Sequence, residues 1–176
     1  MDVKMSDRRG VEWVSTVLYT LISIAIIGIL LAAVRPRIAE MKDNYVISQT
    51  IESLNVLDET INNAKAAEGT TLKYSLQMKK GNLIVDSESD RIIWKSDSDY
   101  MYSEVGKKVQ VGEIGALTEK KGNAYEVSLE LDYPGINVTF SGQDKMKTLN
   151  PASLPYTLWI KNSGIVNGKA WIDISE

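Results

Sequence analysis

The longest uninterrupted apolar segment of the chain lies near its N-terminus. No charged side chain occurs between Trp13 and Val34, and Leu, Ile, Val and Ala make up most of that segment. A helix of about 20 such residues spans the hydrocarbon core of a bilayer. The apolar region of a secretory signal peptide is shorter, at about 7–15 residues. The sequence Leu31-Ala32-Ala33 is an imperfect cleavage site, and Arg35-Pro36-Arg37 follows it closely. The pattern therefore favours a membrane-spanning helix over a cleaved secretory signal.

A helical pattern resumes after the apolar segment. Pro36 predicts a kink or an interruption, and Gly69 is a plausible C-terminal stop. Between them, apolar residues recur every three or four positions: Ile38, Met41, Tyr45, Ile47, Ile51, Leu54, Leu57, Ile61 and Ala64. Residues 36–69 are therefore predicted to form an amphipathic helical stalk that packs on the following domain. A coiled coil or the core of a helical filament would use the same stripe.

After Gly69 the pattern changes from helical to alternating. Apolar and polar residues alternate strictly over 71–78 and again over 125–131, which is typical of half-buried strands. Further strands are expected at 83–85, 91–95, 100–103, from 109 onwards, and at 136–140, 156–161 and 170–174, separated by turns rich in Gly, Asn and Pro. Roughly seven to nine short strands predict an antiparallel β-sandwich or a small barrel.

The chain is thus expected to be an α+β protein with four parts. These are a short N-terminal segment (1–10), a transmembrane helix (11–35), the helical stalk (36–69) and an exported all-β domain (70–176). Basic residues flank the apolar segment equally on both sides, so the positive-inside rule does not decide the orientation. The short N-terminal segment and the β-rich remainder favour a cytoplasmic N-terminus. The potential N-glycosylation acceptor at Asn137 agrees with an exported domain.

Composition removes several classes of function. The chain has 23 acidic and 20 basic residues, no cysteine and no histidine. Nucleic acid is therefore not indicated as a partner. Disulfides, Ser-His-Asp and Cys-His sites and nearly all zinc sites are excluded. We expect neither an enzyme nor a cofactor or metal site.

Two groups of residues have both a structural and a binding interpretation. The acidic run from Asp86 to Asp90 carries calcium-type oxygen ligands, but it lacks the glycine and distal glutamate of an EF-hand loop and is more typical of a turn. Trp94, Trp159 and Trp171 lie in predicted strands, where they either line a carbohydrate site or cover the sheet and fill its core.

Small or hydroxylated residues recur in the apolar segment, and Ser15, Thr20 and Gly28 are the candidates for helix packing. In lipid such residues let helices approach closely, although an ordinary anchor also carries a few. Glu12, at the start of the segment, benefits from the helix dipole at the interface. If it is buried among packed helices, it needs a cationic partner.

Three features occur together in this chain: a charged leader ending Asp7-Arg8-Arg9-Gly10, an apolar helix beginning Trp13-Val14-Ser15-Thr16-Val17-Leu18, and an exported β domain. In this combination the chain resembles archaeal type IV pilin-like proteins. The resemblance implies a class III signal peptide that a prepilin-type peptidase cleaves between Gly10 and Val11, with Arg8 and Arg9 as its basic flank. It also implies that the freed helix bundles with copies of the chain or related subunits in a filament core, with the β domains outside.

One residue departs from the family pattern. Many filament-forming pilins carry a glutamate at the fifth mature position, whereas Glu12 would be the second. An inter-subunit contact between Glu12 and the freed amine of Val11 therefore stays open, and so does an accessory role. The alternative hypothesis is a permanently anchored single-pass protein, in which Arg8-Arg9-Gly10 is a plain cytoplasmic flank. Its β domain would then bind an envelope component such as a glycan, a surface-layer protein or the stator of a machine.

Overall fold

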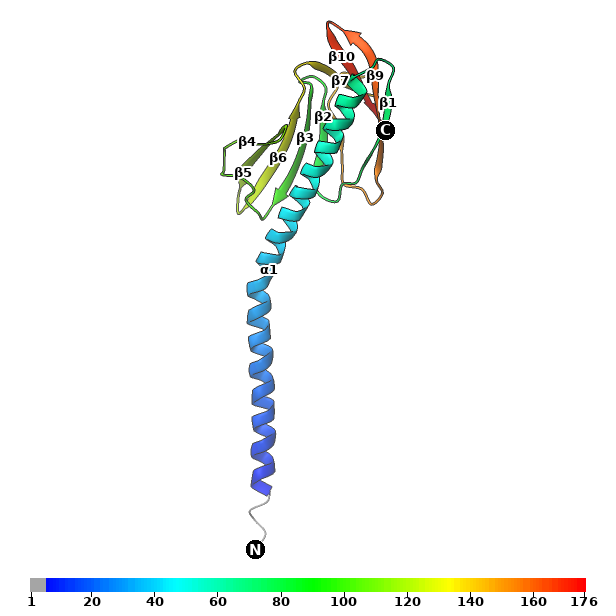
Figure 1. The fold of residues 1–176 in the computed structure, drawn as a ribbon. Helices are drawn as coiled ribbons and strands as arrows, with labels where there is room; N and C mark the ends of the chain where they lie inside the picture. Colours follow the sequence, from blue (N-terminus) through cyan, green and yellow to red (C-terminus); the bar gives the residue numbers. More distant parts are fainter. Residues whose placement is uncertain (1–5) are drawn as a thin grey trace. The chain divides into compact units, whose positions relative to one another are not determined.

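The computed structural model describes the backbone of residues 6–176 and the side chains from Trp13 onwards. In this part of the chain, one long helix, α1 (Ser6–Lys65), is followed by ten strands (Figure 1). The helix runs through Pro36 without a break, so of the predicted kink or interruption the interruption does not occur. Proline removes a single backbone hydrogen bond, and the bonds on either side keep the helix continuous.

The chain divides into two compact units, Met1–Ala39 and Glu40–Glu176. We call the second unit the head; it contains the last part of α1 and all ten strands (Figure 1). The helical segment after the apolar span therefore belongs with the β structure. Its end comes at Lys65, before the predicted stop. Gly69, with a φ of 79°, lies in the turn that leads to the first strand.

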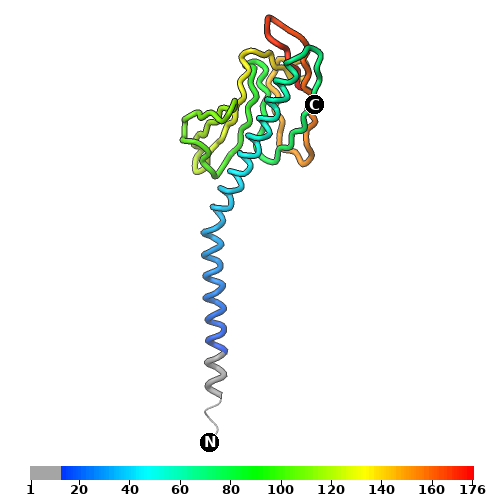
Figure 2. Tube along the Cα trace, in the orientation of Figure 1, coloured from blue at the N-terminus to red at the C-terminus, as the bar shows by residue number. Residues whose placement is uncertain are grey.

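The head contains two sheets, whose strands run from green (β1) to red (β10) in Figure 2. The four-stranded sheet has the order β1 (Thr71–Leu76), β9 (Tyr156–Val166), β10 (Lys169–Ser175) and β7 (Ile136–Phe140). The six-stranded sheet has the order β4 (Val109–Val111), β5 (Ile114–Lys121), β6 (Ala124–Asp132), β3 (Arg91–Ser98), β2 (Asn82–Asp86) and β8 (Lys147–Leu149). Both sheets are open, so the fold is an α+β fold with sheets and not a small barrel.

Three details of the predicted β structure differ. β10 and β7 pair in parallel, whereas every other pair of neighbouring strands is antiparallel. Residues 100–103, predicted as a strand, form bends and irregular structure, and the strand at Lys147–Leu149 was not predicted. Short segments carry too little alternation to be assigned from local pattern alone.

The core lies where the two sheets and the head part of α1 meet. The inner face of the helix contributes a buried stripe of Ile47, Leu54, Leu57, Ile61 and Ala64. Each fully buried Leu or Ile contributes about 1.5–3 kcal/mol by leaving water. The predicted packing of this helix on the β domain is confirmed for these residues.

The first residues of the predicted stripe do not belong to the buried face of the helix. Ile38, Met41 and Tyr45 are exposed, at 59%, 72% and 68% of their surface. Residues 45 and 47 are two positions apart, or about 200° around a helix. One stripe therefore cannot contain both, and the buried stripe is the one that includes Ile47.

Polar contacts fix the helix to the strands at several points along the head. Asp43, which is buried, accepts hydrogen bonds from the Lys80 ammonium and from the backbone N–H of Asp99, the latter at 2.7 Å. The hydroxyl of Tyr74 donates to the carbonyl oxygen of Ser53 at 2.7 Å. These long-range contacts hold the head segment of α1 in one position against the β strands.

Candidate functional sites on the helix and the head

The apolar segment of α1 is a surface without a partner inside its own unit. From Trp13 to Val34 almost every side chain is exposed, including Trp13 at 77% and Ile29 at 70%. Within the described residues there is one helix long and apolar enough to cross a membrane, and it lies near the N-terminus. Because so much apolar surface is costly in water, this segment is suited to lipid or to other apolar helices.

Two hydroxyl groups of this segment, those of Thr20 and Ser23, are satisfied within the helix. The Thr20 hydroxyl lies 2.8 Å from the carbonyl oxygen of Val17 and 3.1 Å from that of Thr16, and the Ser23 hydroxyl donates to the carbonyl oxygen of Tyr19 at 2.8 Å. Such back-bonding removes the need for a polar partner. Thr20 and Ser23 therefore offer a neighbour small, compact surfaces more than free donors.

Gly28 has no packing reason inside the chain. A Cβ built at Gly28 meets no atom within 4 Å, although glycine costs a helix about 1 kcal/mol relative to alanine. Ser15, Thr20 and Gly28 also point in different directions, because each residue turns a helix by about 100°. Ser15 and Thr20 diverge by about 140° and Thr20 and Gly28 by about 80°. Close contacts at all three positions would require more than one neighbouring helix.

The predicted leader site is not described at the level of side chains. Arg8, Arg9, Gly10, Val11 and Glu12 all lie outside the residues whose side chains the structure describes. Cleavage between Gly10 and Val11 and an inter-subunit role for Glu12 therefore stay predictions.

The outer face of the six-stranded sheet carries a network of ion pairs. Arg91 contacts Glu130 at 2.8 Å and Asp86 at 3.4 Å, and Lys108 also contacts Glu130. Burial alone would raise the pKa of Glu130, but hydrogen bonds from Lys108 and Arg91 outweigh it and lower that pKa. Gly115 leaves room for the Lys108 side chain, because a Cβ added at Gly115 would lie 2.2 Å from the Cε of Lys108. The network ties β2, β3 and β6 together across the face.

Beside this network lies a shallow hollow of about 380 Å³. It is lined by Lys80, Gly81, Asn82, Ile84, Lys95, Ser96, Asp97, Lys121 and Glu126. Lys121 bridges the two acids, at 2.9 Å from Asp97 and 3.0 Å from Glu126. The volume would accept a small ligand. However, most of the charged side chains in this lining are already paired.

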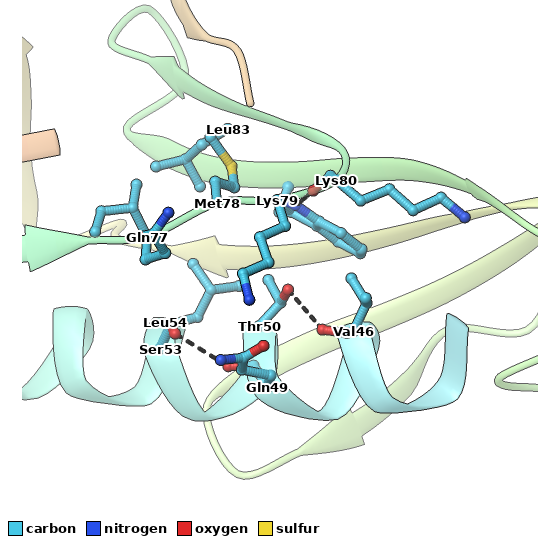
Figure 3. Close-up of a pocket in the computed structure, with 12 residues that line it drawn as sticks. Val46, Gln49, Thr50, Ser53, Leu54, Gln77, Met78, Lys79, Lys80 and Leu83 are labelled. Atoms are coloured by element: carbon cyan, nitrogen blue, oxygen red, sulfur yellow. Dashed lines mark hydrogen bonds between the residues drawn. The ribbon is translucent and has the colours of Figure 1, made fainter. Parts of the chain in front are cut away.

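A second, much smaller pocket lies between α1 and the connection from β1 to β2. Figure 3 shows Val46, Gln49, Thr50 and Ser53 of the helix facing the segment from Gln77 to Lys80. Its volume of about 20 Å³ holds one water molecule. This pocket is a packing gap beside the buried Trp94 and not a ligand site.

The acidic run between β2 and β3 is used for structure. Asp86 pairs with Arg91 and accepts the backbone N–H of Ser89 at 3.4 Å. Asp90 accepts the N–H of Val138 at 3.0 Å and the Lys169 ammonium at 3.1 Å. The buried Ser87 hydroxyl has no partner among the described residues. Because the carboxylates of Asp86 and Asp90 are committed to these contacts, the arrangement supports the turn interpretation over calcium.

The glycosylation acceptor lies within a strand of the folded sheet. Asn137 is half-buried in β7, and Val138 after it is fully buried. The hydroxyl of Thr139 donates to Asp173 at 2.7 Å. Modification of Asn137 stays a prediction, and this geometry means that a glycosylating enzyme would need the chain before the sheet closes.

The three tryptophans of the head lie in two environments that their sequence pattern did not distinguish. Trp94 is fully buried in the core, and its indole N–H donates to the carbonyl oxygen of Lys80 at 3.1 Å. Trp159 is 44% exposed and Trp171 is half-buried on the outer face of the four-stranded sheet. Strand parity separates inner from outer residues, but only the packing of the second sheet and α1 decides which face is inner.

Comparison of the chain with protein-family models, with curated proteins and with solved structures found no match.

Proposed function

We propose that this chain is a pilin-like, membrane-anchored structural subunit of a cell-surface filament or of its accessory machinery. A prepilin-type peptidase removes the leader after Gly10, and the helix from Val11 to about Val34 assembles with copies of itself or with related subunits. The N-terminus starts in the cytoplasm and the head lies outside the membrane.

The observation that carries this proposal is the apolar segment of α1. It is uncharged and exposed from Trp13 to Val34, while the head forms its own core from residue 47 onwards. A lipid anchor needs only apolar surface. Small side chains that face different directions, as at Ser15, Thr20 and Gly28, suit packing among several helices.

Processing is tested by the mass and N-terminal sequence of protein recovered from its native membrane or cell surface. The expected chain begins at Val11. Gly10→Asp should retain Met1 and leave the leader uncut, whereas Ser6→Asp, which adds the same charge further from the junction, should be cut normally. A parent protein that retains its leader would refute processing.

Assembly is tested by substitutions at Gly28. Gly28→Leu should reduce filament recovery and helix-to-helix cross-linking, because a bulky side chain separates helices that approach closely there. Gly28→Ala keeps the surface small and should behave nearly as the parent does. Equal assembly of both variants would show that packing at this position is not the mechanism.

A second candidate function is supported by the exposed Trp159 on the head. In this alternative the helix is a permanent anchor and the head binds a component of the cell envelope. Both proposals are structural and not enzymatic. Turnover that depends on one carboxylate of the head would overturn both.

A further inference from the structure

The outer face of the four-stranded sheet has a distinct chemical character. We define the Trp159 face as Lys73 of β1, Trp159 and Lys161 of β9, and Trp171 of β10. Their inward-facing neighbours, among them Tyr74, Ile160 and Ile172, are buried in the core. Alternation along the strands therefore places the four residues on the side of the sheet away from the core.

Trp159 is the exposed centre of this face. Its indole is 44% exposed, whereas Trp94 is completely buried. Lys73 is directly opposite Trp159 across the β1–β9 pair, and its Nζ lies 6.0 Å from the centre of the indole ring. A cation at this distance is attracted to the ring. The contact keeps an aromatic surface and a positive charge next to each other in water.

Trp171 is held in a fixed orientation. Its indole N–H donates to the Thr139 hydroxyl at 2.8 Å, and that hydroxyl donates to Asp173 at 2.7 Å. Trp159 pairs with Ser175, which is four residues along β10 from Trp171. The backbone positions of the two tryptophans are thus offset by about 13 Å along the strands. A ligand that touches both must be extended, and the locked ring lowers the ordering cost of binding.

The lysines on this face are available to a ligand. Among the described residues, neither Lys73 nor Lys161 takes part in an ion pair. Asp173 is opposite Lys161, but one of its oxygens accepts from both Thr139 and the backbone N–H of Gly142. Glu176 follows Ser175 at the end of β10. Two cations flank Trp159, and an anionic ligand would complement them.

The surroundings of the indoles favour sugar over protein as the ligand. Hydroxyl and amide side chains lie between and beside them, from Thr71, Thr157, Ser175 and Asn137. These groups can hydrogen-bond the hydroxyls of a sugar, while indole faces stack on its apolar C–H surfaces. Protein interfaces are depleted in lysine, whereas lysines pair well with the carboxylates of an acidic sugar.

We infer that the Trp159 face binds an acidic polysaccharide. The inference deepens the second candidate function by naming the class of envelope component. It does not depend on cleavage at Gly10, because all four residues belong to the head. Binding and processing can therefore fail separately, the first in a titration and the second in an N-terminal sequence.

The test titrates full-length protein in detergent micelles with polygalacturonate oligomers, using calorimetry and tryptophan fluorescence. Trp159→Ala should weaken binding about tenfold, which corresponds to about 1.4 kcal/mol. The double variant Lys73→Gln/Lys161→Gln should weaken it by a similar factor and reduce its dependence on salt. Lys120→Gln/Lys145→Gln is the matched control, because it removes the same charge from exposed positions elsewhere on the head.

A neutral glucan of similar length should bind at least tenfold more weakly than the polyuronate. The inference is overturned if the parent protein does not bind polygalacturonate. It is also overturned if the Trp159 and lysine variants bind like the parent, or if the matched control loses as much affinity as the lysine pair. Because Trp159 lies outside the core, its variant should keep the head folded with only a small loss of stability, which a thermal melt checks.

Discussion

The side-chain amide of Asn162 in β9 donates to the carbonyl oxygen of Ala64 in α1 at 3.2 Å and also reaches that of Lys65 at 3.3 Å. The last carbonyls of a helix have no partner within the helix. Asn162 satisfies two of them from a strand 98 residues further along the chain. Its own Oδ1 accepts the backbone N–H of Gly164 at 2.9 Å, so this buried amide joins the end of the helix to the β9 strand.

Replacing Asn162 should therefore destabilise the head. Asn162→Ala leaves buried carbonyls and the N–H of Gly164 without a partner, at a cost of about 1–3 kcal/mol. Asn63→Ala removes an exposed amide near the same end of α1 and should cost much less. Urea denaturation in detergent, followed by circular dichroism, measures both. Equal stability of the two variants would show that Asn162 does not cap the helix.

Two glycines with left-handed backbones should respond very differently to alanine. At Gly81 (φ 77°) an added Cβ would lie 2.6 Å from the Trp94 ring and 2.7 Å from the carbonyl oxygen of Lys95. Gly81→Ala should cost about 3 kcal/mol or more, because the clash includes backbone. At Gly122 (φ 65°) the space is open, and Gly122→Ala should cost only about 1–2 kcal/mol of backbone strain. Thermal melts compare the pair.

Acid should weaken the head through Glu130. Its pKa is lowered in the folded state by Lys108 and Arg91 against the opposing effect of burial, so folding favours the ionised carboxylate. This stabilisation is complete above the unfolded pKa of about 4.3. It is lost as the pH falls through the lower folded pKa. Denaturation midpoints between pH 7 and 3 should fall less steeply for Glu130→Gln than for the parent.

Glu119→Gln is the control for this pH dependence. Glu119 is an exposed carboxylate of β5 with no ion pair among the described residues. Its replacement should leave the acid profile of the parent unchanged. An identical slope for Glu130→Gln and the parent would contradict a role for Glu130.

Alkali should weaken the head through two buried phenols. Burial raises the pKa of Tyr74 to about 12. Burial also raises the pKa of Tyr133, as do the charge of Asp58 and the 2.9 Å hydrogen bond to it. Both phenols favour folding fully below pH 10, and this contribution is lost as the pH rises towards and beyond 12.

Phenolate absorbance should thus show a late step that coincides with unfolding. Tyr74→Phe and Tyr133→Phe should each reduce that step by one phenol. Complete ionisation of every tyrosine while the head is still folded would contradict the prediction.

Local sequence pattern was enough to identify the elements whose signal lies within a few adjacent residues. The uncharged run from Trp13 to Val34 determined the apolar helix, because bilayer-spanning length is read directly from composition. Strict alternation identified β1 and β6, since neighbouring side chains of a strand face opposite sides. The candidate packing residues Ser15, Thr20 and Gly28 could also be named from sequence. The different directions in which they point follow from the helix geometry of about 100° per residue.

The tertiary structure alone decided which residues come together over long separations. Three contacts join segments that are distant in sequence: the parallel pairing of β10 with β7, the ion pair of Asp43 with Lys80, and the capping of α1 by Asn162. No local period encodes such pairings. The same holds for Trp94 and Trp159. Both occupy alternating strand positions, but one is enclosed between the sheets and α1 while the other faces water. Alternation fixes which residues share a face, and the packing of the layers fixes which face becomes the core.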